Sequence, residues 1–149
     1  MSYPPQGNRD HEVYNSVIHD SSIFPASSAN VINFVAGAVA NAWSAWASIV
    51  DSPAGNALNG EFTAVHGHIA DIVIETSSAV NQAYMLEIAY GTATKVRVAI
   101  IRFYGGNVPK QAVRVRGVII PAGESLYYRM RCETGGATAE GHIRYYLEP

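Results

Sequence analysis

The clearest feature of the sequence is a strict alternation of apolar and polar residues near its C-terminus. Between Ser125 and Glu133, one set of alternate positions holds Leu126, Tyr128, Met130 and Cys132. The alternation returns over 139–148, where Ile143 and Tyr145 share a face. A period of two is typical of a strand with one buried and one solvated face. A Gly-Gly turn at 134–138 separates the two runs, so the pattern predicts an antiparallel hairpin.

Similar runs upstream predict strands over 68–76, 84–90, 96–104 and 113–120. The stretch 31–50 has no charged residue and predicts one or two more strands, broken near Gly37. It is long enough to cross a bilayer. However, Asn and Ser residues dilute it, and no Lys or Arg lies between Arg9 and Lys95 to anchor it. No segment keeps helical periodicity over three turns, so the sequence predicts an all-β, jelly-roll-like antiparallel β-sandwich.

The chain of 149 residues is long enough for one domain with a substantial core. Residues 1–30 have scattered apolar positions without a period, and they begin with a Pro-Pro pair. We expect them to form an extended N-terminal arm that serves docking or assembly, and 31–149 to form the sandwich domain. The first residues contain no apolar core of the kind that a secretory signal needs.

Charge is distributed unevenly along the chain, although the net charge is only −2. Residues 1–94 hold one base and eight acids, which gives 1 − 8 = −7, and residues 95–149 hold nine bases and four acids, which gives 9 − 4 = +5. The bases come from several predicted strands, and we expect some to pair with nearby acids. Seven of the nine form a candidate basic stripe, namely Arg97, Arg102, Lys110, Arg114, Arg116, Arg129 and Arg131, and the acids are Glu87, Glu124, Glu133 and Glu140. We therefore expect no nucleic-acid partner and no membrane partner.

The single cysteine, Cys132, excludes an intrachain disulfide. It lies on the apolar face of its predicted strand beside Met130. We expect a thiol in the core rather than a catalytic nucleophile, which would need an accessible and positive setting.

The sharpest lead toward enzyme chemistry is Gly60-x5-His66-x-His68. Histidines two apart on a strand point to the same side and can bind one metal ion. This spacing resembles the first metal motif of the cupins. The expected Glu is missing, since Ile72 and Val73 take its place, and Leu126 stands where the second cupin motif after Pro121-x-Gly123 has its His.

Two of four ligands are thus absent, and the simpler interpretation is a pair of histidines at a strand edge. His142, on a wet strand face, is another available ligand. We assign no catalytic, cofactor-binding or metal-binding residue, and we expect no cofactor and no enzyme activity. A cupin-like metal enzyme that uses His66 and His68 remains the alternative.

The C-terminal part of the chain also resembles a known group of proteins. An Ile120-Pro121-Ala122-Gly123 opening, the following strand with an Arg near its end, the Gly-Gly turn and a closing aromatic strand look like the small jelly-roll virion proteins of tailed bacteriophages. Upstream, Trp43, the loop 51–60, the isoleucines at 69, 72 and 74, and the run 84–91 agree with this resemblance. It covers about residues 41–147.

The resemblance implies a structural virion protein, in the first place a capsid decoration or cement protein that stabilises the phage head. Such proteins bind the major capsid protein and are often homotrimers. They lie on the outer capsid surface, after a period in the host cytoplasm during assembly. The arm and the apolar positions around Trp43 and Trp46 would carry the contacts. A tail or fibre component, and a carbohydrate-binding module that uses exposed Tyr and Trp, are the alternatives.

Overall fold

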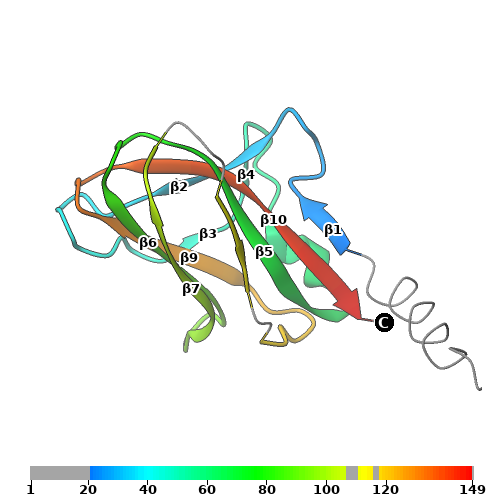
Figure 1. Cartoon of the computed structure of the whole chain (residues 1–149). Coiled ribbons are helices and arrows are strands. Elements are labelled where there is room, and N and C mark those ends of the chain that lie inside the picture. Colours follow the sequence, from blue (N-terminus) through cyan, green and yellow to red (C-terminus); the bar gives the residue numbers. More distant parts are fainter. Residues whose placement is uncertain (1–20, 107–110, 116–117, 149) are drawn as a thin grey trace, which may run out of the picture.

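The computed structural model describes residues 21–106, 111–115 and 118–148, and it confirms the all-β prediction. Figure 1 shows the strands and one short 3₁₀ helix. In chain order the elements are β1 (Ser21–Phe24), β2 (Val31–Val35), β3 (Ala47–Ser48), β4 (Asp51–Ser52), η1 (Leu58–Phe62), β5 (His66–Ser77), β6 (Ala83–Tyr90), β7 (Val96–Tyr104), β8 (Gln111–Arg114), β9 (Leu126–Cys132) and β10 (Thr138–Glu148).

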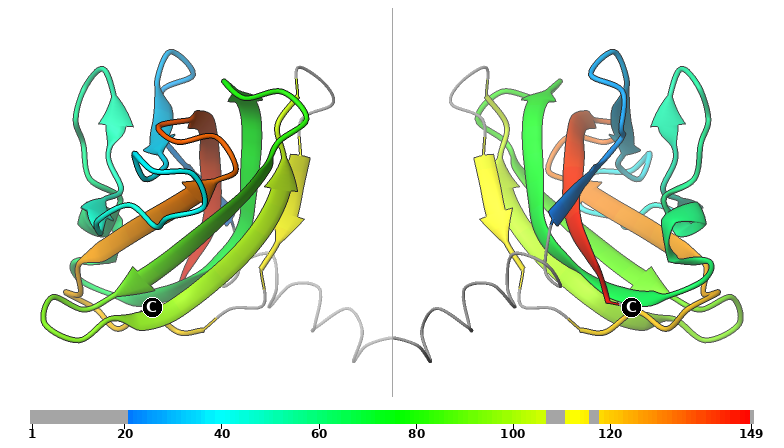
Figure 2. Two further views of the ribbon diagram at one scale, coloured as in Figure 1. Left: turned by 90° about the vertical axis from the view of Figure 1, so that its left-hand side faces the viewer. Right: turned by 90° about the vertical axis from the view of Figure 1, so that its right-hand side faces the viewer.

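The strands form two antiparallel sheets that pack as a sandwich. The first sheet has the order β4-β2-β10-β5-β8, with β1 also paired to β10, and the second has the order β3-β9-β6-β7. Figure 2 shows the second sheet lying across the first. Apart from the short β1 and β4, four strands fall in each sheet, and their order is that of a double-sheet jelly roll.

Strand β10 organises the first sheet. It pairs along nearly its whole length with β5, while β1 and β2 follow one another along its other edge. Residues 21–24, which the sequence pattern assigned to the arm, therefore belong to the sheet: Ser21 pairs with Tyr146. Residues 1–20 of the predicted arm lie outside the described residues.

Aromatic and aliphatic side chains from the facing sides of both sheets fill the core. Phe34 and Tyr128 meet edge to face with ring centroids 5.0 Å apart, and the Val35 N–H donates to the Tyr128 hydroxyl over 3.1 Å. Tyr84 stacks on Phe103 at 4.8 Å. The predicted inward face of 125–133 is confirmed, because all four of its apolar residues are buried, including Cys132.

The predicted hairpin of the two C-terminal strands is wrong. Strand β9 lies in the second sheet and β10 in the first, so the turn between them crosses from one layer to the other. Alternation and a Gly-Gly turn are common to a hairpin and to such a crossing. The choice is made by distant partners, because β9 pairs with β6 whereas β10 pairs with β5.

Two other predicted strands are shorter than expected. In the stretch 31–50, only Ala47–Ser48 is a strand after the predicted break near Gly37, so Trp43 and Trp46 lie in an irregular segment and do not alternate along a strand. The strand predicted over 113–120 is observed as Gln111–Arg114, and Ile120 makes an isolated bridge to Gly67. In the part of the chain that the structure describes, no helix has the length and apolar character to span a bilayer.

A candidate binding surface of arginine and tryptophan

The outer face of the second sheet carries the most distinctive group of side chains. Alternation in β9 turns Arg129 and Arg131 away from the core, because the residues on either side of each arginine are buried. In the neighbouring strand β6, Met85 and Glu87 lie opposite Arg131 and Arg129 in register. On the other side of Met85, β7 contributes Arg102. Three strands thus bring their side chains to one face.

The irregular segment 36–46 lies along the edge of β9 opposite β6 and adds the two tryptophans. Its backbone is bonded to the strand: the Gly37 and Ser44 N–H groups both donate to the Met130 carbonyl, over 3.1 and 3.0 Å. The Met130 N–H in turn donates to the Ser44 hydroxyl over 3.1 Å. Gly37 is required here, because a Cβ would lie 2.2 Å from the Ala42 carbonyl oxygen. Asn41 has a φ of 61°, a conformation that Asn tolerates better than most residues.

Arg129 lies between the two tryptophans. Its guanidinium carbon is 4.6 Å from the Trp43 ring centroid and 4.7 Å from that of Trp46. Arg131 also contacts Trp43, at 4.8 Å. Guanidinium groups at these distances are attracted by the negative faces of the rings. The contacts therefore run continuously from Trp46 through Arg129 and Trp43 to Arg131, and they hold both indole rings in place.

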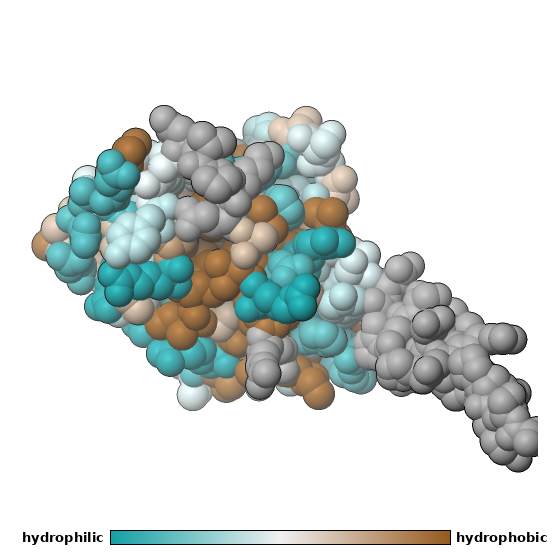
Figure 3. Space-filling view, viewed as in Figure 1, coloured by the Kyte–Doolittle hydropathy of each residue, from teal (hydrophilic) through white to brown (hydrophobic). Residues whose placement is uncertain are grey.

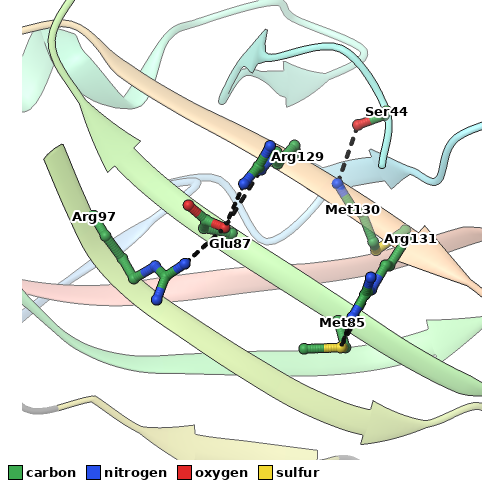
Figure 4. A network of polar contacts seen from close by, with 7 residues as sticks. All are labelled: Ser44, Met85, Glu87, Arg97, Arg129, Met130 and Arg131. Atoms are coloured by element: carbon green, nitrogen blue, oxygen red, sulfur yellow. Dashed lines mark hydrogen bonds and ion pairs between the residues drawn. The ribbon is translucent and has the colours of Figure 1, made fainter. Parts of the chain in front are cut away.

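Glu87 fixes the guanidinium group of Arg129. The carboxylate oxygen Oε2 accepts hydrogen bonds from Arg129 Nη2 and Nε, at 3.1 and 3.3 Å, and from Arg97 Nη2 at 3.5 Å. Figure 4 shows the two arginines reaching Glu87 from opposite sides. Glu87 is only 4% exposed, so its charge depends on these partners. This confirms the expectation that some of the arginines pair with Glu87.

Arg129 lies opposite an acid on β6, whereas Arg131 lies opposite a methionine and contacts its sulfur atom. Its Nη2 and Nε point to the sulfur of Met85, at 3.0 and 3.4 Å (Figure 4), and a thioether is a weak acceptor. Arg102, on the other side of Met85, donates to the Tyr104 hydroxyl over 3.3 Å. Both arginines border a hollow of about 350 Å³.

Exposed apolar side chains accompany these groups. Ile100 and Tyr104 on β7 are 39% and 56% exposed and flank Arg102 in sequence. Figure 3 has the view of Figure 1, and on that side of the molecule hydrophobic residues gather near the centre with hydrophilic residues around them. We call the outer surface of the second sheet the Arg–Trp face, and its members are Trp43, Trp46, Met85, Glu87, Arg97, Arg102, Arg129 and Arg131.

The basic residues singled out in the sequence do not form one stripe. Arg97, Arg102, Arg129 and Arg131 belong to the Arg–Trp face, whereas Arg114 lies on β8 in the first sheet, with its Nε 3.9 Å from Asp71. Lys110 and Arg116 lie outside the described residues. The positive charges on the second sheet are therefore confined to a small area, which also contains the buried carboxylate of Glu87.

His66 and His68 do point to the same side of β5, as the spacing predicts. Both approach one carboxylate on β10: His66 Nε2 is 3.2 Å from Glu148 Oε2, and His68 Nδ1 is 3.3 Å from Glu148 Oε1. His142 is instead paired with Glu75 at 3.5 Å. Within the described ranges no three His, Cys, Asp or Glu residues have an arrangement that could hold a metal ion. The structure thus places each of these histidines beside a carboxylate of the first sheet.

A second hollow, of about 570 Å³, lies beside η1 and is lined by amides and carboxylates, among them Asn30, Asn56 and Asp51. A hydrogen bond from the Asn30 amide, together with bonds from Asn56 and Gly55, lowers the pKa of Asp51. Nearby, the Tyr145 hydroxyl donates to Glu61 over 3.0 Å. Burial, and then the Glu61 carboxylate, raises the pKa of Tyr145 to about 12. The polar groups around this hollow therefore bind one another, and they stabilise the chain between β4 and η1.

Sequence reasoning named the two tryptophans and the arginines, but it missed Met85 and it did not predict that Arg129 would join Trp43 and Trp46. The only available signal was the outward position of the arginines in the alternation. Comparison with protein-family models gives no match, and neither does comparison with curated proteins. The function of the chain is therefore inferred from the geometry of the Arg–Trp face together with the sequence pattern.

Proposed function

We propose that the chain is a non-enzymatic structural protein of a tailed-phage virion that decorates the outer surface of the capsid. Its partners would be the major capsid protein and further copies of itself in a homotrimer. The observation that carries the proposal is the preformed Arg–Trp face. Trp and Arg are enriched among the residues that dominate protein–protein binding energy, and charged groups there are effective when they are already held in position.

Three features support this function. The sandwich has the jelly-roll order expected from the resemblance. The tryptophans are fixed before binding, because Arg129 contacts both and is itself bonded to Glu87. Exposed Ile100 and Tyr104 provide apolar area beside the charges. Together these features match the mixture of aromatic, Arg and Met residues that is typical of interfaces.

The test is co-sedimentation with capsids assembled from the major capsid protein of the same phage. The wild-type chain should sediment with the capsids and saturate them. Trp46→Ala, which removes a large part of the Arg–Trp face, should weaken attachment strongly. Ile23→Ala removes an exposed apolar side chain from the first sheet and serves as the matched control. Equal attachment by both variants would remove the Arg–Trp face from the mechanism.

Two further measurements test the assembly. Light scattering coupled to size exclusion should give three times the mass of the chain. Deletion of residues 1–20 should leave the sandwich folded, since β1 begins at Ser21, and should abolish attachment if the arm docks. Attachment by the truncated protein would exclude the arm from docking.

A carbohydrate-binding module is the alternative from another class. Sugar rings stack on open aromatic faces. Guanidinium groups already contact the rings of Trp43 and Trp46, which favours a protein partner over a sugar. Specific binding on a glycan array would reverse this preference.

A further inference from the structure

The outer face of the second sheet contains two arginine-flanked positions on β6 that differ in one respect. Glu87 receives Arg129 from β9 and Arg97 from the β7 side. Met85, two residues earlier on the same face of β6, is paired with Arg131 on β9 and with Arg102 on β7. The first position has an acid between two bases, and the second has a thioether between two bases.

At the second position, the N–H groups of the two arginines have only weak or neutral hydrogen-bond acceptors. Arg131 directs two N–H donors at the Met85 sulfur, and Arg102 donates to the neutral Tyr104 hydroxyl. No ion pair among the described residues joins either of them to a carboxylate. Guanidinium groups bind carboxylates more strongly than they bind neutral acceptors, and often through two bonds.

A hollow marks the place where such an acid would enter. It has a volume of about 350 Å³ and is lined by Met85, Arg102 and Arg131 together with Asn41, Ala83 and Glu133. Glu133 also lines the hollow: its Oε2 accepts the Ala83 N–H over 3.3 Å, and its negative charge offsets that of one arginine. The charge of the lining is therefore 2 − 1 = +1.

We propose that the hollow between Arg131 and Arg102 is a binding site for a carboxylate, supplied by an acidic side chain of a partner protein. The acid would occupy, beside Met85, the role that Glu87 has beside Arg129. A lining charge of +1 suits a single carboxylate. That the acid belongs to a partner protein rests on the proposed function, while the carboxylate site itself rests on the geometry alone.

The site can be filled from within the chain. Met85→Glu places a carboxylate between Arg131 and Arg102, and this should block an external acid. Ala112→Glu is the matched control, because it makes the same change in charge at an exposed position on β8 of the first sheet. Arg131→Met removes one of the two bases without filling the site, and Arg144→Met, on exposed Arg144 of β10, is its control.

The experiment measures binding of a fluorescein-labelled peptide of six glutamates to the full chain at low ionic strength. The wild-type chain should bind it saturably. Met85→Glu and Arg131→Met should each weaken binding by about tenfold or more, since each removes charge-assisted hydrogen bonds to the ligand, whereas the two controls should stay within about twofold. Circular dichroism checks that each variant is folded. If one test variant does not fold, the other test variant and its control still test the proposal.

Lack of saturable binding by the wild type, or equal weakening by a test variant and its control, would overturn the proposal. Tighter binding of a labelled seven-residue oligothymidylate, whose six phosphates match the six carboxylates of the peptide, would overturn the assignment to an acidic protein. Capsid co-sedimentation separates this inference from the proposed function. If Met85→Glu no longer binds the peptide but still binds the capsid, the acid does not belong to the capsid protein, and the proposed role as a decoration protein stands. If the wild-type chain binds the peptide but not the capsid, the proposed role as a decoration protein fails, and the carboxylate site stands.

Discussion

Replacing Arg129 by Met should destabilise the fold far more than the same change at Arg97, although both arginines bind Glu87. Arg129 supplies two hydrogen bonds to Glu87 Oε2, and it contacts both tryptophans. Arg97 supplies one bond of 3.5 Å from a side chain that is 57% exposed. Loss of Arg129 would therefore leave a buried carboxylate that depends on this weak partner.

The magnitude can be worked from these contacts. Removing one partner of a buried ion pair costs about 3–5 kcal/mol, and each lost cation–π contact adds about 0.5–1 kcal/mol, while Arg97 and the Met side chain offset part of the loss. We expect the free energy of unfolding to fall by about 3–5 kcal/mol for Arg129→Met, which lowers the Tm by about 6–20 °C in a domain of this size. Arg97→Met should cost less than about 1 kcal/mol, as for exposed ion pairs.

The double variant Glu87→Met/Arg129→Met provides the sharpest control. It removes the buried charge together with its partner, and a buried ion pair is often replaced by apolar side chains at little cost. It should therefore be more stable than Arg129→Met alone. The assay is urea unfolding followed by far-ultraviolet circular dichroism at one fixed protein concentration, because tryptophan fluorescence would report on the altered site itself. A double variant no more stable than the single one, or equal costs at Arg129 and Arg97, would show that the buried charge of Glu87 is not the cause.

Other predictions concern the segment 36–46, the alkaline limit of the fold and the acidic limit. Gly37→Ala should lower the free energy of unfolding by about 1–3 kcal/mol, as over-packing does, and should shift the tryptophan emission. Gly60→Ala is the control, because a Cβ at Gly60 meets nothing within 4 Å and should change neither quantity. Equal effects of the two variants in urea unfolding would contradict the close approach at Gly37. Because the pKa of Tyr145 is raised to about 12, its contribution to stability is complete below the unfolded pKa of about 10 and is lost as the pH rises through 12, so Tyr145→Phe should flatten the fall of unfolding free energy across this range. The pKa of Asp51 is lowered, so its contribution is present above its unfolded pKa and is lost as the pH falls through the folded value; Asp51→Asn should reduce the acid dependence of stability, and an unchanged acid profile would count against the bonds from Asn30 and Asn56.

Sequence reasoning succeeded where the determinants are local. Alternation gives the inward face of β9, because neighbouring residues on a strand must point to opposite sides, and Met130 and Cys132 are buried as predicted. It failed where distant parts of the chain decide. The same alternation does not reveal that β9 pairs with β6 and that β10 pairs with β5, which is why the hairpin prediction was wrong.

The candidate site was likewise only partly predictable. Outward arginines can be read from the alternation, and Glu87 was a sensible partner for them. The positions of Trp43 and Trp46 could not be read in this way, because their segment is held by backbone bonds to Met130 and not by a strand pattern. The role of Met85 depends on its register with Arg131 and Arg102, which only the sheet order supplies.

The proposed attachment of the Arg–Trp face to a capsid is tested most directly by a cryo-electron microscopy map of capsids saturated with the chain. We expect β6, β7 and β9 to face the shell in this map, with Trp46 and Arg102 in contact with the capsid protein. A map in which β5 and β10 face the shell, and the Arg–Trp face is turned to solvent, would contradict the proposed mode of attachment.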